Sequence, residues 1–310
     1  MSGRPKYADL PDGSAWDVLD PQLGSLQLLT PERVAAAAKL VTTGKRFSLD
    51  LPLTLPSPPF FGREPFEHTI FPLGISNVYD DKLDNFFPQS STQWDGFGHF
   101  GHAEKGFFGG RSSDDVEAAT LGIEAWAAAG IAGRGVLLDV GRHAAVPCDV
   151  ASMITVDMLQ ATADAERLEL REGDILCVRT GWLGHYKGLD QAGRDAIAAG
   201  SRDFTFEKFQ TPGLGSGIEI AEFLWDHGVA AIAVDNPGVE PFGPGGAGVA
   251  SDSVHTRVLA MLGIPLGEFF DLDALADDCA ADGVYEFLFT SAPLGIPGGL
   301  GSPPNAIAIK

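Results

Sequence analysis

The sequence has few cysteines, few basic residues and no long uninterrupted apolar run. Its three cysteines are widely spaced and form no Cys-x-x-Cys pair, so neither a disulfide framework nor a cysteine zinc site is indicated. Only 21 Lys and Arg residues stand against 42 Asp and Glu residues, for a formal net charge of -21. This balance argues against nucleic acid or an anionic membrane as a partner, because both would be repelled. The N-terminus also lacks the apolar run of a signal peptide, and no stretch approaches the roughly 18 apolar residues of a membrane span. We therefore expect a cytoplasmic protein that acts on a small molecule.

What is present indicates an α/β enzyme. The 310 residues are 45% hydrophobic and 20% charged, as in an ordinary globular chain, and strand-like runs alternate with helical patterns. We expect helices over 31–43, 114–129, 155–165, 218–226 and 271–279, and strands over 134–140, 174–179 and 229–235. Thr30 and Asp271 are the expected N-caps of the first and last helices. The proline-rich residues 51–65 are expected to wrap as an extended arm.

The segment 89–102 gathers the polar groups of an active site. It reads Gln-Ser-Ser-Thr-Gln-Trp-Asp-Gly-Phe-Gly-His-Phe-Gly-His. If it is extended, the period-2 alternation of a strand places Gln89, Gln93, Asp95 and His99 on one face. His102 falls outside that alternation, so two roles stay open for it: a second proton carrier, or a ring packed under neighbouring aromatic residues.

This segment resembles the signature of the cyclase family that includes kynurenine formamidase and isatin hydrolase, His-x-Gly-Thr-His-x-Asp-x-Pro-x-His. Gln89 and Gln93 stand where the family has its first two histidines, and Asp95 and His99 match its Asp and last His. The resemblance implies that the first two motif positions and the Asp bind a divalent metal, while His99 acts in catalysis. Both motif histidines that bind metal are glutamines here.

The resemblance extends from about residue 30 to the end of the chain. It includes the segments 134–140, 172–182, 230–237, 253–255 and 301–308 in the family's order. In the family, a later histidine and glutamate complete the metal site. The matching positions are His255 and Glu268, and Glu268 requires a one-residue adjustment in spacing. The implied fold is a swivelling β/β/α domain over residues 31–310, preceded by an N-terminal extension over 1–30 and assembled as a homodimer or homotetramer.

Chemistry allows a metal site with these ligands. Asp95 and His255 are ordinary ligands for zinc or manganese, and amide oxygens of Gln89 or Gln93 can coordinate a hard cation. The glutamines can instead hydrogen-bond substrate or backbone in a site without metal. The leading prediction is a hydrolase of an amide, imide or lactone that uses metal-activated water, with His99 as general acid and base. Two alternatives stay open: a metal-independent lyase or cyclase that uses His99 and Asp95, and a noncatalytic small-molecule binding protein.

Substrate contacts are predicted only in outline. Trp94 and Phe97 could line a pocket for a planar or apolar ligand, and His68 could approach the site from the N-terminal side. Arg63 and Arg179 could hold a substrate carboxylate. The glycine-rich stretch 242–248 lacks the Lys-Ser/Thr of a phosphate loop and is expected to be a mobile loop beside His255 that could close over the site.

Overall fold

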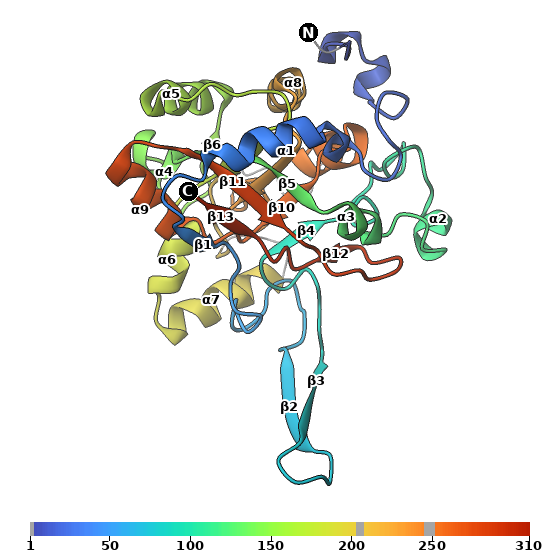
Figure 1. Cartoon of the computed structure of the whole chain (residues 1–310), viewed down its shortest axis with the longest axis vertical. Coiled ribbons are helices and arrows are strands. Elements are labelled where there is room, and N and C mark those ends of the chain that lie inside the picture. The colour runs from blue at the N-terminus through green and yellow to red at the C-terminus, as the bar shows by residue number, and fades with distance from the viewer. Residues whose placement is uncertain (1–2, 203–207, 245–251) are drawn as a thin grey trace.

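A nine-stranded mixed sheet forms the centre of the computed structural model, which describes residues 3–202, 208–244 and 252–310. Its strand order is β1-β13-β11-β5-β7-β9-β10-β4-β12 (Figure 1). Its strands are β1 (Arg46–Ser48), β4 (Gln93–Asp95), β5 (Ile131–Leu138), β7 (Ile175–Val178), β9 (Ala231–Val234), β10 (Leu266–Glu268), β11 (Glu286–Ser291), β12 (Gly301–Ser302) and β13 (Ile307–Ile309). A separate short pair consists of β6 (Met153–Ile154) and β8 (Gly213–Leu214).

The centre of the sheet is parallel and fully buried. Strand β5 pairs in parallel with β7, β7 with β9, and β9 with β10. Every residue of β7 and β9 is buried, as is typical of strands covered on both faces. Strand β4 then joins this centre through antiparallel pairing with β10. The α/β class and the strands predicted over 134–140, 174–179 and 229–235 are therefore confirmed, with bounds that differ by one to three residues at most ends.

Helices lie around this sheet. They are α1 (Pro31–Ala37), α2 (Ser113–Glu117), α3 (Glu124–Ala129), α4 (Val140–His143), α5 (Val156–Glu166), α6 (Trp182–Gly188), α7 (Gln191–Arg202), α8 (Ile218–His227) and α9 (Asp273–Asp282). Helix α1 begins as predicted, with the Thr30 side chain accepting a hydrogen bond from the Arg33 amide and Pro31 at the first position. Helices α5 and α8 also lie where the sequence predicts them.

Three helix predictions are wrong in detail. The helix predicted over 31–43 ends at Ala37 and continues only as a 3-10 turn, η4 (Ala38–Leu40). The single helix predicted over 114–129 is two short helices, α2 and α3, because Ala119 adopts a left-handed conformation (φ 60°) that ends the first. Asp271 is not the N-cap of the last helix, which begins at Asp273 after Leu272. The Asp271 carboxylate instead accepts a hydrogen bond from Lys187 at 2.7 Å.

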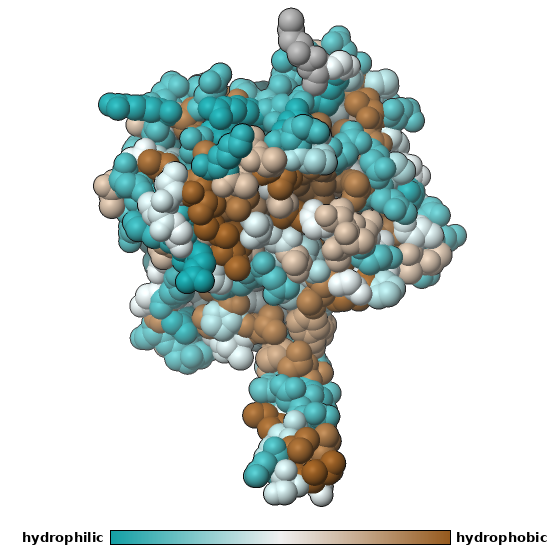
Figure 2. Space-filling view, viewed as in Figure 1, coloured by the Kyte–Doolittle hydropathy of each residue, from teal (hydrophilic) through white to brown (hydrophobic). Residues whose placement is uncertain are grey.

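A β-hairpin extends away from the body of the molecule (Figure 1). It pairs β2 (Glu67–Pro72) with β3 (Tyr79–Asp84). Hydrophobic side chains are exposed toward its far end, among them Ile70 and Ile75 (Figure 2). The sequence analysis predicted no hairpin here.

The proline-rich arm over 51–65 is anchored by an aromatic cluster. Phe60 is buried and packs edge-on against Trp182, Tyr186 and Phe209. These contacts hold the arm against α6, next to the end of β10. Most of the glycine-rich loop predicted over 242–248 lies outside the described residues. The prediction that this loop closes over the site therefore stays a prediction.

The N-terminal segment packs on helix α8 and on the π-helix η5 (His255–Met261). The Tyr7 amide donates to Asp226 at 2.8 Å, and the Ala15 amide donates to the Met261 carbonyl at 2.9 Å. Among the described residues, none of the helices has the length and apolar character needed to cross a membrane.

Candidate metal centre and active site

Strand β4 supplies two of the site's side chains. Gln93 and Asp95 are two residues apart, so both point to one face of the sheet, whereas Trp94 points to the other. Gln93 lies opposite Glu268 of β10, and Asp95 lies opposite Leu266. The antiparallel pairing of β4 with β10 thus brings Glu268 beside the motif despite more than 170 residues of separation.

His255 completes a buried cluster with Asp95 and Glu268. Their potential ligand atoms all lie within 4.8 Å of one another. The His255 Nε2 atom is 3.4 Å from Asp95 Oδ2 and 3.4 Å from Glu268 Oε1. The residues are 0%, 5% and 8% exposed for Asp95, Glu268 and His255. The structure therefore brings together three residues that the sequence analysis selected from distant segments.

His99 reaches the same cluster from a turn. Strand β4 ends at Asp95, and the His99 amide donates to the Gly96 carbonyl, so the strand alternation predicted through His99 is wrong beyond Asp95. The turn nevertheless places His99 Nε2 3.7 Å from Asp95 Oδ1, with 29% of its side chain exposed. His99 is thus the histidine of the cluster that solvent or a substrate can reach.

The Gln93 amide links the two carboxylates. Its Nε2 donates to Asp95 Oδ1 at 3.1 Å and to Glu268 Oε2 at 3.0 Å. Its Oε1 is buried and has no hydrogen-bond partner among the described residues. Buried polar atoms without partners are rare in folded proteins, which makes this oxygen a candidate ligand.

The charged groups of the cluster shift one another's pKa values. Burial and the nearby Asp95 carboxylate raise the pKa of Glu268 to about 7. Burial would also raise the pKa of Asp95, but its interactions with His99, His255 and Arg63 hold that pKa below its ordinary value. Burial opposes protonation of His255, yet Glu240, Asp95 and Glu268 together raise its pKa above the ordinary value. The three carboxylates thus favour a positive charge at the His255 ring that lies between them.

These residues fit a divalent metal. A tetrahedral site with metal–ligand bonds of about 2.1 Å separates its ligand atoms by roughly 3.4 Å, which matches the two distances from His255 Nε2. A histidine and two carboxylates are ligands that zinc and manganese accept, and three protein ligands leave a position open for water or substrate. The unpartnered Gln93 Oε1 could add a fourth ligand atom.

Other predicted site residues lie elsewhere. Trp94 and Phe97 are core residues: the Trp94 indole donates to Ser291, and Phe97 packs against Phe108 and Trp126. His68 is on the exposed hairpin, where it pairs with Asp81 at 2.8 Å.

Gln89 and His102 are the two remaining predicted site residues of the motif segment. The Gln89 amide lies against Gly301, which is opposite Asp95 in β12. His102 Nδ1 accepts hydrogen bonds from the Glu104 and Lys105 amides, so the ring organises its own turn. Among the described residues, neither side chain forms a hydrogen bond or ion pair with Asp95, His255 or Glu268. The roles predicted for Gln89 and His102 stay predictions.

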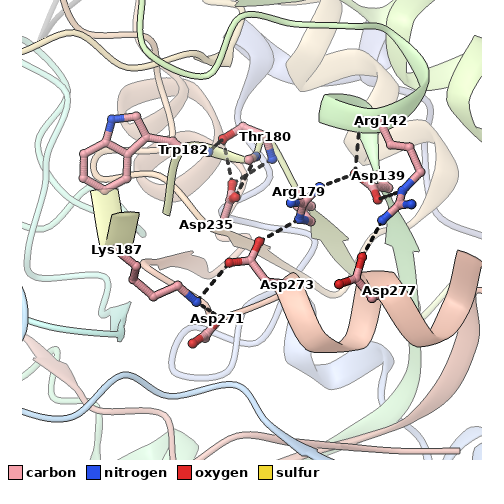
Figure 3. Close-up of polar contacts among 11 residues, drawn as sticks. Asp139, Arg142, Arg179, Thr180, Trp182, Lys187, Asp235, Asp271, Asp273 and Asp277 are labelled. Atoms are coloured by element: carbon pink, nitrogen blue, oxygen red, sulfur yellow. Dashed lines mark hydrogen bonds and ion pairs between the residues drawn. The ribbon is translucent and has the colours of Figure 1, made fainter. Parts of the chain in front are cut away.

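The two arginines proposed for a substrate carboxylate differ. Arg179 lies in an ion-pair network with Asp139 and Asp273, each at 2.9 Å (Figure 3), so its guanidinium is already engaged. Lys187 extends this network to Asp271 and Asp273. Arg63, by contrast, forms no ion pair within 4.0 Å in the described part of the chain, yet its charge acts on Asp95 and Glu268.

Glu240, which contacts His255, was missed as a site residue. Glu240 accepts hydrogen bonds from His255, and the Phe100 ring lies 5.2 Å from the His255 ring. Glu240 follows the carboxyl end of β9, where polar residues of parallel sheets commonly gather. That position could have identified it.

Comparisons with known proteins agree with this architecture. Residues 47–241 match the family described as "Putative cyclase". A solved structure described as a novel cyclase is 32% identical, with a TM-score of 0.82 over 96% of this chain and 99% of that chain. Isatin hydrolase A from Ralstonia solanacearum is 18% identical, with a TM-score of 0.59 over 91% of this chain and 98% of that one. An isatin hydrolase bound to the product analogue thioisatinate is 16% identical, with a TM-score of 0.56 over 92% and 97%. The isatin hydrolases are similar in fold. A comparison with curated proteins found no match.

Proposed function

The chain belongs to the cyclase family of enzymes, and from this premise we propose that it is a metal-dependent hydrolase of an amide, imide or lactone. One observation carries the proposal: Asp95, His255 and Glu268 converge in a buried cluster, and the partly exposed His99 lies beside it. The noncatalytic alternative gives no reason for such a costly concentration of buried charge.

The ligands would be Asp95, His255 and Glu268, with the Gln93 amide oxygen as a further donor. Zinc and manganese suit this mixed set of nitrogen and oxygen donors. A cation held there would polarise a substrate carbonyl and lower the pKa of water. The amide of Gln93 must rotate to turn its oxygen toward a cation, because its nitrogen faces both carboxylates in this structure.

His99 is the proposed general acid and base. Burial lowers the pKa of His99 below its ordinary value, and the Asp95 carboxylate only partly opposes that shift. The ring is then neutral at pH 7 and can accept a proton from attacking water. The protonated ring can return that proton to the leaving nitrogen or oxygen, with Asp95 stabilising its charge at 3.7 Å.

Arg63 is the proposed contact for an anionic part of the substrate or product. Hydrolysis of an amide or lactone creates a carboxylate, and a guanidinium binds carboxylates well. Arg63 lies within electrostatic reach of Asp95 and Glu268. Because isatin hydrolases share the fold, isatin and other cyclic amides are the first substrates to test.

The test measures hydrolysis of cyclic amides, imides and lactones before and after chelation, and again after Zn²⁺ or Mn²⁺ is restored. The proposal expects activity that chelation removes and metal restores, and that His99→Ala abolishes. Activity that survives complete metal removal would favour the metal-independent lyase or cyclase that uses His99 and Asp95. The homodimer or homotetramer stays a prediction that light scattering can test.

A further inference from the structure

Glu240 holds His255 with both of its carboxylate oxygens. Its Oε1 accepts the His255 backbone amide at 2.8 Å, and its Oε2 is 2.7 Å from His255 Nδ1. Glu240 is 2% exposed, so water cannot replace these contacts. Because Nδ1 faces Glu240, the other ring nitrogen, Nε2, faces Asp95 and Glu268.

The loop that carries Glu240 is fixed by its surroundings. The Asn236 side-chain amide donates to the carbonyls of Pro212, Pro237 and Glu240. The Leu214 amide of β8 donates to the Val239 carbonyl at 2.8 Å. A fixed loop positions the Glu240 carboxylate independently of any ligand.

Two backbone features show how closely this loop is packed. Val239 has φ 58°, a conformation that costs energy for a β-branched residue and that persists only where the surroundings enforce it. Gly213 lies against the loop, and a β-carbon at 213 would collide with the backbone of Val239 and Glu240. Both features occur directly beside the residue that contacts His255.

We propose that Glu240 is a positioning residue that orients His255, so that Nδ1 carries a proton toward Glu240 and Nε2 presents its lone pair to a cation. Metal-binding histidines commonly donate the second ring N–H to a carboxylate, which fixes the tautomer and makes the ligand more basic. This inference deepens the proposed function, since the cation is the one proposed there. The orientation of the ring itself does not depend on that cation.

The experiment compares the full-length chain with Glu240→Ala and Glu240→Gln. Glu166→Gln is the matched control, because Glu166 is also buried and also accepts a backbone amide, from Asp139, but lies outside the cluster. Titration calorimetry with Zn²⁺ and Mn²⁺ measures the Kd. In parallel, proton and nitrogen NMR of metal-free protein measures the His255 Nδ1–H signal, which is assigned by its loss in His255→Gln.

The proposal expects Glu240→Ala to weaken metal binding about tenfold to a hundredfold, and to lose the protected Nδ1–H signal. Glu240→Gln should lose less, because the amide oxygen can occupy one of the two accepting positions, while the amide nitrogen occupies the other and cannot accept. The control should change neither. An unchanged thermal midpoint shows that Glu240→Ala folds. If such a folded variant also keeps the wild-type Kd and the Nδ1–H signal, the proposal is overturned.

The two proposals can fail separately. If Glu240→Ala does not fold, the same two measurements on Glu240→Gln decide, and wild-type values there would overturn the positioning role. If the wild-type chain binds neither metal, the proposed hydrolase fails, while the Nδ1–H signal in wild type and variant still decides whether Glu240 orients the ring.

Discussion

Replacing Gln93 with histidine should tighten zinc binding. In this structure the Gln93 amide nitrogen is bonded to both Asp95 and Glu268, and its oxygen has no described partner. A cation that used this oxygen would require the amide to rotate and to release both hydrogen bonds. Histidine at this position would offer a nitrogen donor that zinc prefers over an amide oxygen.

The size of the effect follows from those two hydrogen bonds. A hydrogen bond to a charged group contributes about 1.5 kcal/mol at the low end of its range. A neutral imidazole in the metal-free variant can donate to only one of the carboxylates, so it gives up one such bond fewer when the cation binds. We therefore expect Gln93→His to lower the Kd for Zn²⁺ by about tenfold, since about 1.4 kcal/mol corresponds to a factor of ten.

Calorimetry or competition with a chromophoric chelator measures this change. Gln160→His is the control, because Gln160 is exposed on α5 and its amide bonds to Asp164, away from the predicted ligands. The gain should be smaller for Mn²⁺, which has less preference for nitrogen. Equal Zn²⁺ affinity in wild type and Gln93→His, or an equal gain in Gln160→His, would contradict this expectation.

Three further predictions concern the acid and base, the charge of the substrate and the pH dependence of stability. His99→Ala should keep its metal and lower kcat by a factor on the order of 10² to 10⁴, as elemental analysis and steady-state kinetics of one preparation can show; loss of metal from this variant would make His99 a ligand instead. Arg63→Met should raise KM about tenfold for a substrate that carries a carboxylate and leave KM unchanged for its neutral amide, whereas equal effects on both would remove Arg63 from recognition. Burial raises the pKa of Glu166 to about 8 in the folded protein, so the folded state holds this proton more tightly than the unfolded state. The stability that the proton contributes is complete below the unfolded pKa of Glu166. It is lost as pH rises toward 8, with a slope of up to about 1.4 kcal/mol per pH unit. Denaturant unfolding of Glu166→Gln should therefore show a smaller loss of stability between pH 6 and pH 8 than wild type, and identical losses would contradict the assignment.

The central strands could be predicted because local pattern and environment agree. The apolar runs of β7 and β9 are short, bounded by turn residues and buried at every position, and the second half of β5 is buried as well. Helix 114–129 was mispredicted because its alanine content favours one continuous helix, whereas the left-handed Ala119 divides it. Helix propensity contains no information about such a tertiary constraint.

The site was predictable only in part. The motif and the resemblance selected Asp95, His99, His255 and Glu268, and the cross-strand pairing of β4 with β10 then explains how they meet. Between His255 and Glu268 the chain forms the π-helix η5, a rare element that helix propensity alone does not predict.

Single-sequence patterns did not identify Glu240 or the hairpin. Glu240 acts through a loop whose path depends on Gly213 and, through Asn236, on Pro212, and both of these residues are distant from Glu240 in sequence. The strands of the hairpin mix charged and apolar residues on exposed faces, so they lack the clear alternation of a half-buried strand.

The proposed function requires that Asp95, His255 and Glu268 hold a divalent cation. Elemental mass spectrometry of purified, tag-free wild type and of Asp95→Ala measures this directly. We expect roughly one zinc or manganese ion per wild-type chain, retained through dialysis, and a loss of that ion in Asp95→Ala because a buried ligand is removed. Equal metal content in both proteins, or none in wild type even after incubation with Zn²⁺ and Mn²⁺, would contradict it.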